Sequence, residues 1–217
     1  MKRSCILAHR GLHFCEEEKN RPMSIKRAID EGFGVETDLR DFDRTVVISH
    51  DPPTSSTYLL TLNWLLDQIA LPGYSGRTAL NIKSDGLAKL IYPLIKAKVS
   101  QPERCFVFDM SVPDALSYIG GPLNVYTRVS NFECKPAYLE MAKGVWIDDF
   151  SGSFPQVEHA KDLISRGYRV AIVSPELHGR DHVVVWDRIE DSGVFLSPLF
   201  ELCTDLPLDA ANRFCCS

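Results

Sequence analysis

The sequence has no long hydrophobic run. None of its apolar stretches approaches the roughly 20 residues that a membrane-spanning helix needs. A basic start, Met1-Lys2-Arg3, is followed by an apolar stretch over residues 5–8 only, whereas a secretory signal carries about 7–15 apolar residues at this point. We therefore expect no transmembrane segment and no secretory signal, and we expect the protein to be cytoplasmic.

The sequence also lacks a cysteine framework and an excess of positive charge. Its seven cysteines form no CxxC pair and no Cys/His cluster at zinc-ligand spacing, which argues against a disulfide scaffold and favours a reducing cytosol. The net charge of −5 argues against nucleic acid or an anionic membrane as a partner.

What is present is the composition of an ordinary globular protein. Of the 217 residues, 45% are hydrophobic, 24% charged and 10% aromatic, which argues against disorder and low complexity. The chain is long enough for one sizeable core, and it contains neither a linker nor an internal sequence repeat. We therefore expect a single domain over residues 1–217, and the sequence leaves the oligomeric state open.

Short apolar runs alternate with helical patterns along the whole chain. Helix signals include Pro22 before and Gly32 after one segment, and an apolar stripe over residues 87–95. Eight strand–helix alternations predict a compact (β/α)₈ TIM barrel, with an open doubly wound α/β sheet as the alternative. Residues 45–50 are predicted to form a hairpin-like excursion after the second strand. The predicted strands are residues 4–8, 34–40, 78–83, 105–110, 124–128, 144–148, 169–174 and 194–197.

The second predicted strand carries charge on one face. Because alternate residues of a strand share a face, Glu36, Asp38 and Arg40 lie together. Charges inside a barrel are costly unless they are paired or bound to a metal. Two carboxylates at a barrel mouth suit a hard divalent cation, and the alternative is an internal ion pair of Asp38 with Arg40 or Arg10.

Polar residues also mark the C-terminal ends of most other predicted strands. In (β/α)₈ enzymes this end of the barrel carries the chemistry, with residues drawn from several strands at once. We therefore predict a functional site at this end. The residues concerned are His9, Arg10, Asn81, Lys83, Asp109, Arg128, Asp148, Asp149, Glu176 and His178.

Several short motifs follow one another in order. They are Ala8-His9-Arg10-Gly11, Gly34-Val35-Glu36-Thr37-Asp38, Ser49-His50-Asp51-Pro52, Leu80-Asn81-Ile82-Lys83 and Thr204-Asp205-Leu206-Pro207. This ordered set resembles the glycerophosphodiester phosphodiesterase family, within a wider group of barrel phosphodiesterases. The motifs match over residues 4–90 and 203–207, and the segment between them matches only in its strand rhythm.

The resemblance implies two catalytic histidines and two phosphate-binding cations. His9 and His50 resemble the general acid/base pair of the family. Histidine gains or loses a proton near neutral pH, so one ring can deprotonate the attacking oxygen while the other protonates the leaving oxygen; which ring does which is left open. Arg10 and Lys83 resemble the cations that hold the phosphate.

The resemblance also implies a divalent metal, Mg²⁺ or Ca²⁺. Glu36 and Asp38 resemble two of its ligands. The third position, a glutamate in the family, is Asn81 here; an amide oxygen can coordinate but brings no charge, so weaker metal affinity is expected. Asp109, on the neighbouring predicted strand, is a candidate for the missing carboxylate.

The implied reaction is the metal-dependent hydrolysis of a small-molecule phosphodiester, a step of lipid metabolism. The products would be glycerol 3-phosphate and an alcohol, and the sequence does not identify the alcohol. Two alternatives remain. One is a catalytically weakened barrel that binds a phosphorylated metabolite, which Asn81 motivates; the other is a lyase or aldolase that uses Lys83 as a Schiff-base nucleophile.

Overall fold

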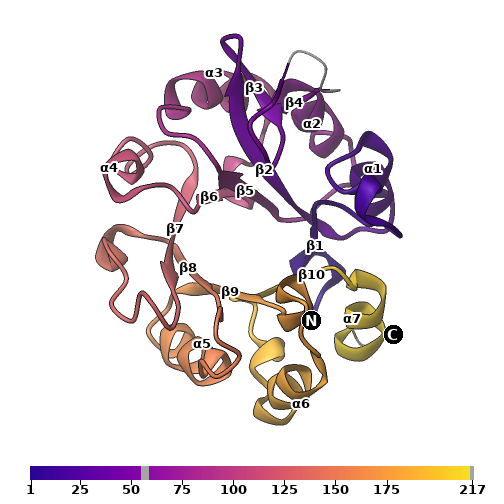
Figure 1. Ribbon diagram of the computed structural model, residues 1–217, viewed down its shortest axis with the longest axis vertical. Helices are drawn as coiled ribbons and strands as arrows, with labels where there is room; N and C mark the ends of the chain where they lie inside the picture. Colours follow the sequence, from indigo (N-terminus) through magenta and orange to yellow (C-terminus); the bar gives the residue numbers. More distant parts are fainter. Residues whose placement is uncertain (55–58, 216–217) are drawn as a thin grey trace.

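The computed structural model describes residues 1–54 and 59–215, and within them eight parallel strands close into a barrel (Figure 1). Neighbouring strands follow the order β1-β10-β9-β8-β7-β6-β5-β2, and β2 pairs back onto β1. This closure confirms the compact (β/α)₈ barrel and excludes the open sheet. The barrel strands are β1 (Ile6–His9), β2 (Gly34–Phe42), β5 (Thr78–Ile82), β6 (Cys105–Phe108), β7 (Asn124–Val129), β8 (Gly144–Ile147), β9 (Arg169–Val173) and β10 (Phe200–Thr204).

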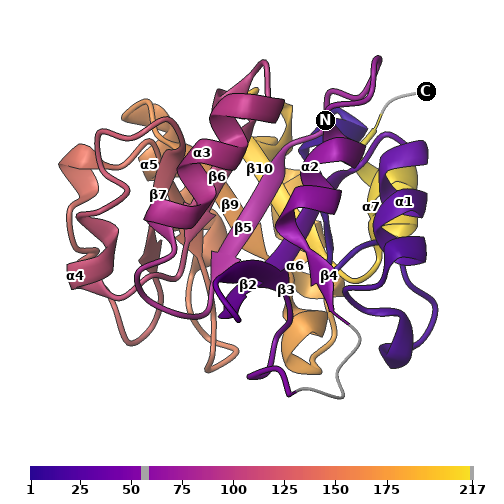
Figure 2. The ribbon, with the colours of Figure 1, turned by 90° about the horizontal axis from the view of Figure 1, so that it is seen from above.

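Helices surround the barrel, as Figures 1 and 2 show. The longer helices bury an apolar stripe against the strands; in α1, for example, Ile25, Ala28 and Ile29 are buried together with Ser24. Within the described residues, no helix is long and apolar enough to cross a membrane. The helices are α1 (Pro22–Asp30), α2 (Leu62–Ile69), α3 (Ala88–Lys98), α4 (Val112–Ala115), α5 (Gln156–Ser165), α6 (Val183–Ser192) and α7 (Pro207–Phe214).

Strand β2 runs beyond the barrel and turns back as a hairpin. It pairs antiparallel with β3 (Thr45–Ile48), which then pairs with the short β4 (Leu60–Thr61). The predicted excursion over residues 45–50 is therefore confirmed. Because β3 returns toward the barrel, the Ser49 backbone N–H donates to the Asp38 carbonyl at 3.1 Å. The hairpin thus delivers the residues after β3 to the C-terminal ends of the barrel strands.

The eighth barrel strand is β10, and the prediction of a strand at residues 194–197 is wrong. Val194–Leu196 forms a 3-10 helix directly after Gly193, which ends α6 with a positive φ of 67°. The true strand was hidden by Glu201, a charge that points into the barrel and is fully buried. It is tolerated there because Arg77 Nε and Arg169 Nη2 lie 2.7 Å and 2.8 Å from its Oε1.

Aromatic rings fill the middle of the barrel. Phe106 stacks on Tyr126 with ring centroids 3.8 Å apart, and Phe108 stacks on Trp146 at 3.9 Å. The Tyr126 hydroxyl donates to Glu201 at 3.1 Å and joins the rings to the charged cluster at the N-terminal ends of the strands. This packing fills the barrel from its middle to the N-terminal ends of the strands. The C-terminal ends are left for a site.

Candidate active site

A cavity of about 350 Å³ lies at the C-terminal ends of the barrel strands. Most of the residues that the sequence singled out converge on it although they come from separate segments. Asp38 does not line the cavity itself but lies directly behind it, where it contacts two lining side chains. The predicted site residues that line the cavity are His9, Arg10, Glu36, His50, Asn81, Lys83 and Asp109.

His9 ends β1 and is held by a carboxylate from the neighbouring strand. Its Nδ1 lies 2.7 Å from Asp205 Oδ1, and its Nε2 lies 3.9 Å from Glu36 Oε2. Burial lowers the pKa of His9, although hydrogen bonding to Asp205 opposes the shift. With Nδ1 fixed by Asp205, Nε2 is the ring nitrogen that can exchange a proton with a molecule in the cavity.

Asp205 was not among the predicted site residues, although it stands in the C-terminal Thr-Asp-x-Pro motif that supplied the signal. It follows β10, and its backbone N–H donates to Glu176 Oε1 at 3.2 Å. Burial raises its pKa, but the hydrogen bond from His9 and the charges of His9, Lys19 and His13 outweigh burial and lower the pKa to about 2. Asp205 is therefore an ionised carboxylate that orients His9.

Arg10 adopts a left-handed backbone conformation, with φ 55°. In this turn its backbone N–H donates to Glu36 Oε2 at 3.3 Å, and its Nε forms an ion pair with Asp38 Oδ2 at 2.9 Å. The next residue, Gly11, has φ 90°, and a Cβ there would lie 2.6 Å from the Ser24 carbonyl carbon. The His-Arg-Gly motif thus encodes a tight turn that aims Arg10 at the strand ends.

Asp38 is fully buried among groups that bind its negative charge. Asn20 Nδ2 donates to its Oδ2 at 2.9 Å, and Lys83 Nζ lies 3.4 Å from its Oδ1. Burial raises the pKa of Asp38, but the charges of Arg10 and Lys83 and the Asn20 hydrogen bond outweigh burial and lower it. The internal ion pair with Arg10, left open by the sequence, is present in the structure.

Three residues carry oxygen atoms of the types that divalent cations bind. Glu36 is buried, and burial together with the charge of Asp38 raises its pKa to about 8. A positive charge beside Glu36 would therefore stabilise its ionised form. Asp38 and Asn81 are paired in register on β2 and β5, and the Oδ1 atoms of both are buried without a hydrogen bond from any described residue. The described residues hold no cluster of three or more His, Cys, Asp or Glu suited to a metal. These three residues therefore offer only two carboxylates and one amide.

Asp109 lies beside Asn81 at the end of β6. Its Oδ2 accepts a hydrogen bond from Asn81 Nδ2 at 3.2 Å, and its Oδ1 accepts one from Arg128 Nη1 at 3.0 Å. Burial raises the pKa of Asp109, while Arg128 and Lys83 oppose the shift. Because the Asn81 amide nitrogen is bound to Asp109, its oxygen is turned away from this carboxylate.

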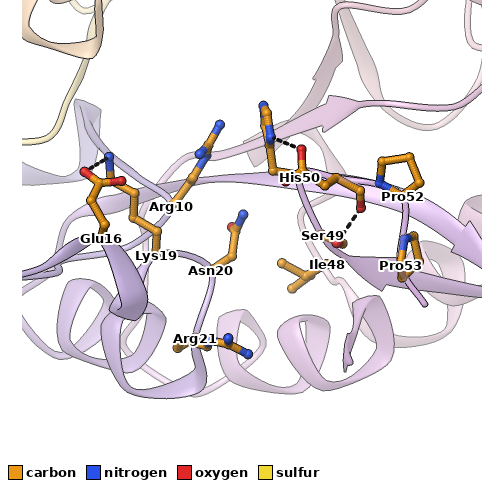
Figure 3. Close-up of a pocket in the computed structure, with 11 residues that line it drawn as sticks. Arg10, Glu16, Lys19, Asn20, Arg21, Ile48, Ser49, His50, Pro52 and Pro53 are labelled. Carbon is orange, nitrogen blue, oxygen red and sulfur yellow. Dashed lines mark hydrogen bonds and ion pairs between the residues drawn. The ribbon is translucent and has the colours of Figure 1, made fainter. Parts of the chain in front are cut away.

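His50 lies on the loop after β3, between two cavities. Its carbonyl accepts a hydrogen bond from Arg40 Nε at 2.9 Å, and its half-exposed ring has Nδ1 2.9 Å from Asp51 Oδ1. Figure 3 shows the second cavity, of about 370 Å³, with His50 and Arg10 on neighbouring walls and Lys19 beyond Arg10. The two cavities share His50 and Arg10, so both open onto the same strand ends.

Comparisons with known proteins identify the fold. No family model and no curated protein matches the chain. Among solved structures, a glycerophosphodiester phosphodiesterase from Parabacteroides distasonis ATCC 8503 superposes with a TM-score of 0.74 at 20% identity, covering 96% of this chain and 95% of that chain. A putative one from Galdieria sulphuraria gives 0.72 at 15% identity, covering 96% of both chains. One from Agrobacterium tumefaciens str. C58 gives 0.66 at 16%, covering 93% and 96%.

The fold is thus the (β/α)₈ barrel of these solved structures. The similarity extends over nearly the whole chain and over nearly the whole of each of these three structures. The protein therefore has the fold of the glycerophosphodiester phosphodiesterases, the same family that its ordered motifs resemble.

Proposed function

We propose that this protein is a metal-dependent phosphodiesterase that hydrolyses a glycerophosphodiester to glycerol 3-phosphate and an alcohol. The observation that carries the proposal is the convergence of His9, His50, Arg10 and Lys83 on one cavity at the functional end of the barrel. The shared fold with glycerophosphodiester phosphodiesterases supports it. A role in lipid metabolism in the cytoplasm is part of the proposal, and the free cysteines among the described residues agree with a reducing compartment.

The cations at the mouth bind the phosphate. Arg10 and Lys83 both line the cavity, and a guanidinium and an ammonium there attract a phosphodiester anion. Glu36, Asp38 and Asn81 would hold Mg²⁺ or Ca²⁺. Such an ion, when bound, neutralises charge that grows on the phosphate oxygens in the transition state.

The two histidines move the protons. His9 presents Nε2 toward the cavity from β1, and His50 lines the same cavity from the β3 loop. One ring takes the proton of the attacking oxygen, and the other supplies a proton to the oxygen that leaves. Asp205 supports this exchange because it fixes the orientation of the His9 ring.

The histidine roles are tested by substitution. We expect His9→Ala and His50→Ala each to lower kcat by about 100-fold or more, because each removes a proton-transfer group. Release of glycerol phosphate from a panel of glycerophosphodiesters gives kcat, and circular dichroism checks folding. The control is His159→Ala, a half-buried histidine on α5 that stacks on Phe154. Full turnover by either folded site variant contradicts its proposed role.

The metal is tested by removal. EDTA is expected to abolish hydrolysis and added Mg²⁺ or Ca²⁺ to restore it, since Glu36, Asp38 and Asn81 are the residues proposed to hold the cation through their oxygen atoms. The wild-type assay above supplies the readout, and calorimetry with each metal alone gives its affinity. Hydrolysis that is indifferent to EDTA contradicts the metal dependence.

A binding protein without turnover is the second candidate. It is favoured by Asn81, which supplies no charge, and by Asp38, whose carboxylate already pairs with Arg10 and Lys83. Calorimetric binding of glycerol 3-phosphate in the absence of metal, with no product formed from any diester, would support this candidate over the enzyme. A Schiff-base role for Lys83 requires that borohydride trap a carbonyl substrate on this residue.

A further inference from the structure

The two halves of the cavity differ in what they contribute. One half, from β1, β2, β5 and the loop after β3, carries the residues of the proposed reaction, whereas the other half comes from β6 to β9 and takes no part in it. We infer that this second half, the β6–β9 wall, binds the alcohol of the diester and that this alcohol is a neutral ring polyol, a sugar or cyclitol; the inference rests on the proposed function. The polar and aromatic residues of the wall are Asp109, Arg128, Trp146, Asp148, Phe150 and His178.

The β6–β9 wall is continuous and begins beside a phosphate-binding cation. Lys83 follows β5, and Asp109 follows the neighbouring strand β6. Asp109 Oδ1 accepts a hydrogen bond from Arg128 Nη1 at 3.0 Å, and the Arg128 guanidinium carbon lies 5.8 Å from the centroid of the Phe150 ring. The rings of Phe150 and His178 then meet edge to face, with centroids 5.3 Å apart. One of the two groups esterified to a phosphate at Lys83 therefore faces this wall.

The charges of the wall favour a neutral alcohol. Its two carboxylates already have partners, because Asp109 binds Arg128 and Asp148 Oδ1 lies 2.7 Å from His178 Nε2. A cationic alcohol would find no free carboxylate, and it would meet the Arg128 guanidinium over the face of Phe150. An anionic alcohol would meet both carboxylates. A group without charge avoids both conflicts.

Three polar atoms of the wall are open to hydroxyl groups. Arg128 Nη2, Asp148 Oδ2 and His178 Nδ1 have no hydrogen-bond partner among the described residues. The guanidinium can only donate, the carboxylate accepts, and the imidazole nitrogen does either according to its protonation. A hydroxyl both donates and accepts, so a group with several hydroxyls matches this mixed set. These atoms come from three successive barrel segments, at the end of β7, after β8 and after β9.

The aromatic residues of the wall favour a ring. Phe150 is 41% exposed, although its ring is apolar, and it lines the cavity. Trp146 also lines the cavity, and it is held in place because it stacks on Phe108 at a centroid distance of 3.9 Å. An apolar ring surface beside a few fixed polar groups suits the C–H face of a sugar or cyclitol. The glycerol of the diester has only two free hydroxyls and no such face.

The experiment compares two diesters that share glycerol phosphate and differ in their alcohol. The inositol diester carries a ring polyol, whereas the choline diester carries a cation without a hydroxyl. Calorimetry with Mg²⁺ on His50→Ala, in which turnover is expected to be lost, gives the affinity for each diester. We expect the inositol diester to bind at least about 10-fold more tightly, because choline leaves the donors and acceptors of the wall unpaired.

Two further substitutions in the same background test the wall itself. Phe150→Ala removes the exposed ring and His178→Ala removes Nδ1, and each is expected to bring the two affinities to within about threefold of each other. The matched controls are His159→Ala on α5 and Phe14→Ala, an exposed ring that lines neither cavity. Both controls are expected to keep the full preference. Circular dichroism checks folding, and either wall variant suffices if the other does not fold.

The outcomes separate the inference from the proposed function. Equal affinity for the two diesters, or tighter binding of the choline diester, overturns the inference, and equal affinity is also the result if the wall holds the glycerol. A preference that survives both Phe150→Ala and His178→Ala overturns the assignment to this wall. If the inositol diester is preferred but the wild-type protein hydrolyses neither diester, the site of the polyol stands and the proposed hydrolysis does not.

Discussion

At the residue scale, Asp205 is a carboxylate on which three basic groups converge. His9 Nδ1 lies 2.7 Å from it, Lys19 Nζ 3.2 Å and His13 Nε2 3.6 Å. Asp205 is also well buried, with 19% of its side chain exposed. A carboxylate in such surroundings stays ionised far below its ordinary range, and its charge becomes a stabilising feature of the folded state.

Replacing that charge is expected to change how stability depends on pH. The folded-state pKa of Asp205 is lowered from 3.8 to about 2, so the stability it contributes is fully present above pH 3.8 and is lost as pH falls toward 2. Asp205→Asn should therefore lower the free energy of unfolding by about 2 kcal/mol near pH 6, and the difference should shrink in acid. Urea unfolding of both proteins from pH 3 to 7 measures it.

The control for this comparison is the exposed Asp162, whose ion pair with Arg166 lies on the surface of α5. Asp162→Asn is expected to change stability by less than about 1 kcal/mol at every pH. A gap between wild type and Asp205→Asn that stays constant from pH 3 to 7 would show that the charge of Asp205 does not stabilise the fold.

Local patterns brought candidate residues together where they share a strand or a motif. Glu36 and Asp38 share a face by simple alternation, and in the structure Glu36 lines the cavity while Asp38 lies directly behind it. The pairing of His9 with Asp205 was beyond local patterns, because 196 residues separate the partners. His178 and Asp148 were recognised only as polar residues at strand ends, since their contact depends on how two loops fold over the barrel.

At the element scale, the N-terminal ends of the barrel strands are joined by a buried ion cluster. Glu201 on β10 accepts hydrogen bonds from Arg77, at the start of β5, and from Arg169 on β9. The Arg77 guanidinium also donates to the Tyr126 hydroxyl at 3.0 Å. Four strand regions around the ring are thereby tied to one carboxylate.

Neutralising that carboxylate should weaken the barrel. Glu201→Gln leaves the buried Arg77 and the partly buried Arg169 as two like charges without their partner, and we expect a loss of about 3–5 kcal/mol in the free energy of unfolding. The control is Asp67→Asn in the surface pair with Lys98, for which about 0–1 kcal/mol is expected. Urea unfolding of both variants decides the matter, and equal effects would mean that the cluster contributes no more than a surface pair.

The elements themselves were largely predictable. Seven of the eight strand predictions overlap barrel strands, and the punctuation by Pro22 and Gly32 marked α1. The failure at residues 194–197 has a physical cause. An apolar run after a helix end was read as a strand, while the real strand carries Glu201 at an interior position that an alternation rule treats as outward-facing.

At the scale of the whole molecule, the ring closes where the chain begins and ends. The Met1 ammonium donates to the Phe214 carbonyl at 2.8 Å, and α7 packs beside β1 (Figure 1). Closure itself was predictable because eight strand–helix units fill a barrel. The shape of the cavity was not, because it depends on loops whose side chains meet only in the folded chain.

The proximity of the chain ends predicts that they can be joined. A permutant that links residue 215 to residue 1 through a short Gly/Ser linker and opens the chain between Pro72 and Gly73 should keep the fold and the diester hydrolysis proposed here. The cut lies on the α2–β5 connection, at the barrel end remote from the cavity, and Gly73 has open space around it. Circular dichroism and the release of glycerol phosphate from the same panel of glycerophosphodiesters check the outcome. An unfolded permutant would show that the order of closure matters.

The stacked rings and the charged cluster close the barrel at the N-terminal ends of its strands. Substrate and both products therefore enter and leave the cavity through its one open end. In the function proposed here, the phosphomonoester keeps its charge and is held by the cations Arg10 and Lys83, whereas the neutral alcohol has no such partner. We therefore expect ordered product release: the alcohol leaves first, and the phosphomonoester, which leaves last, competes with the next diester for the cavity.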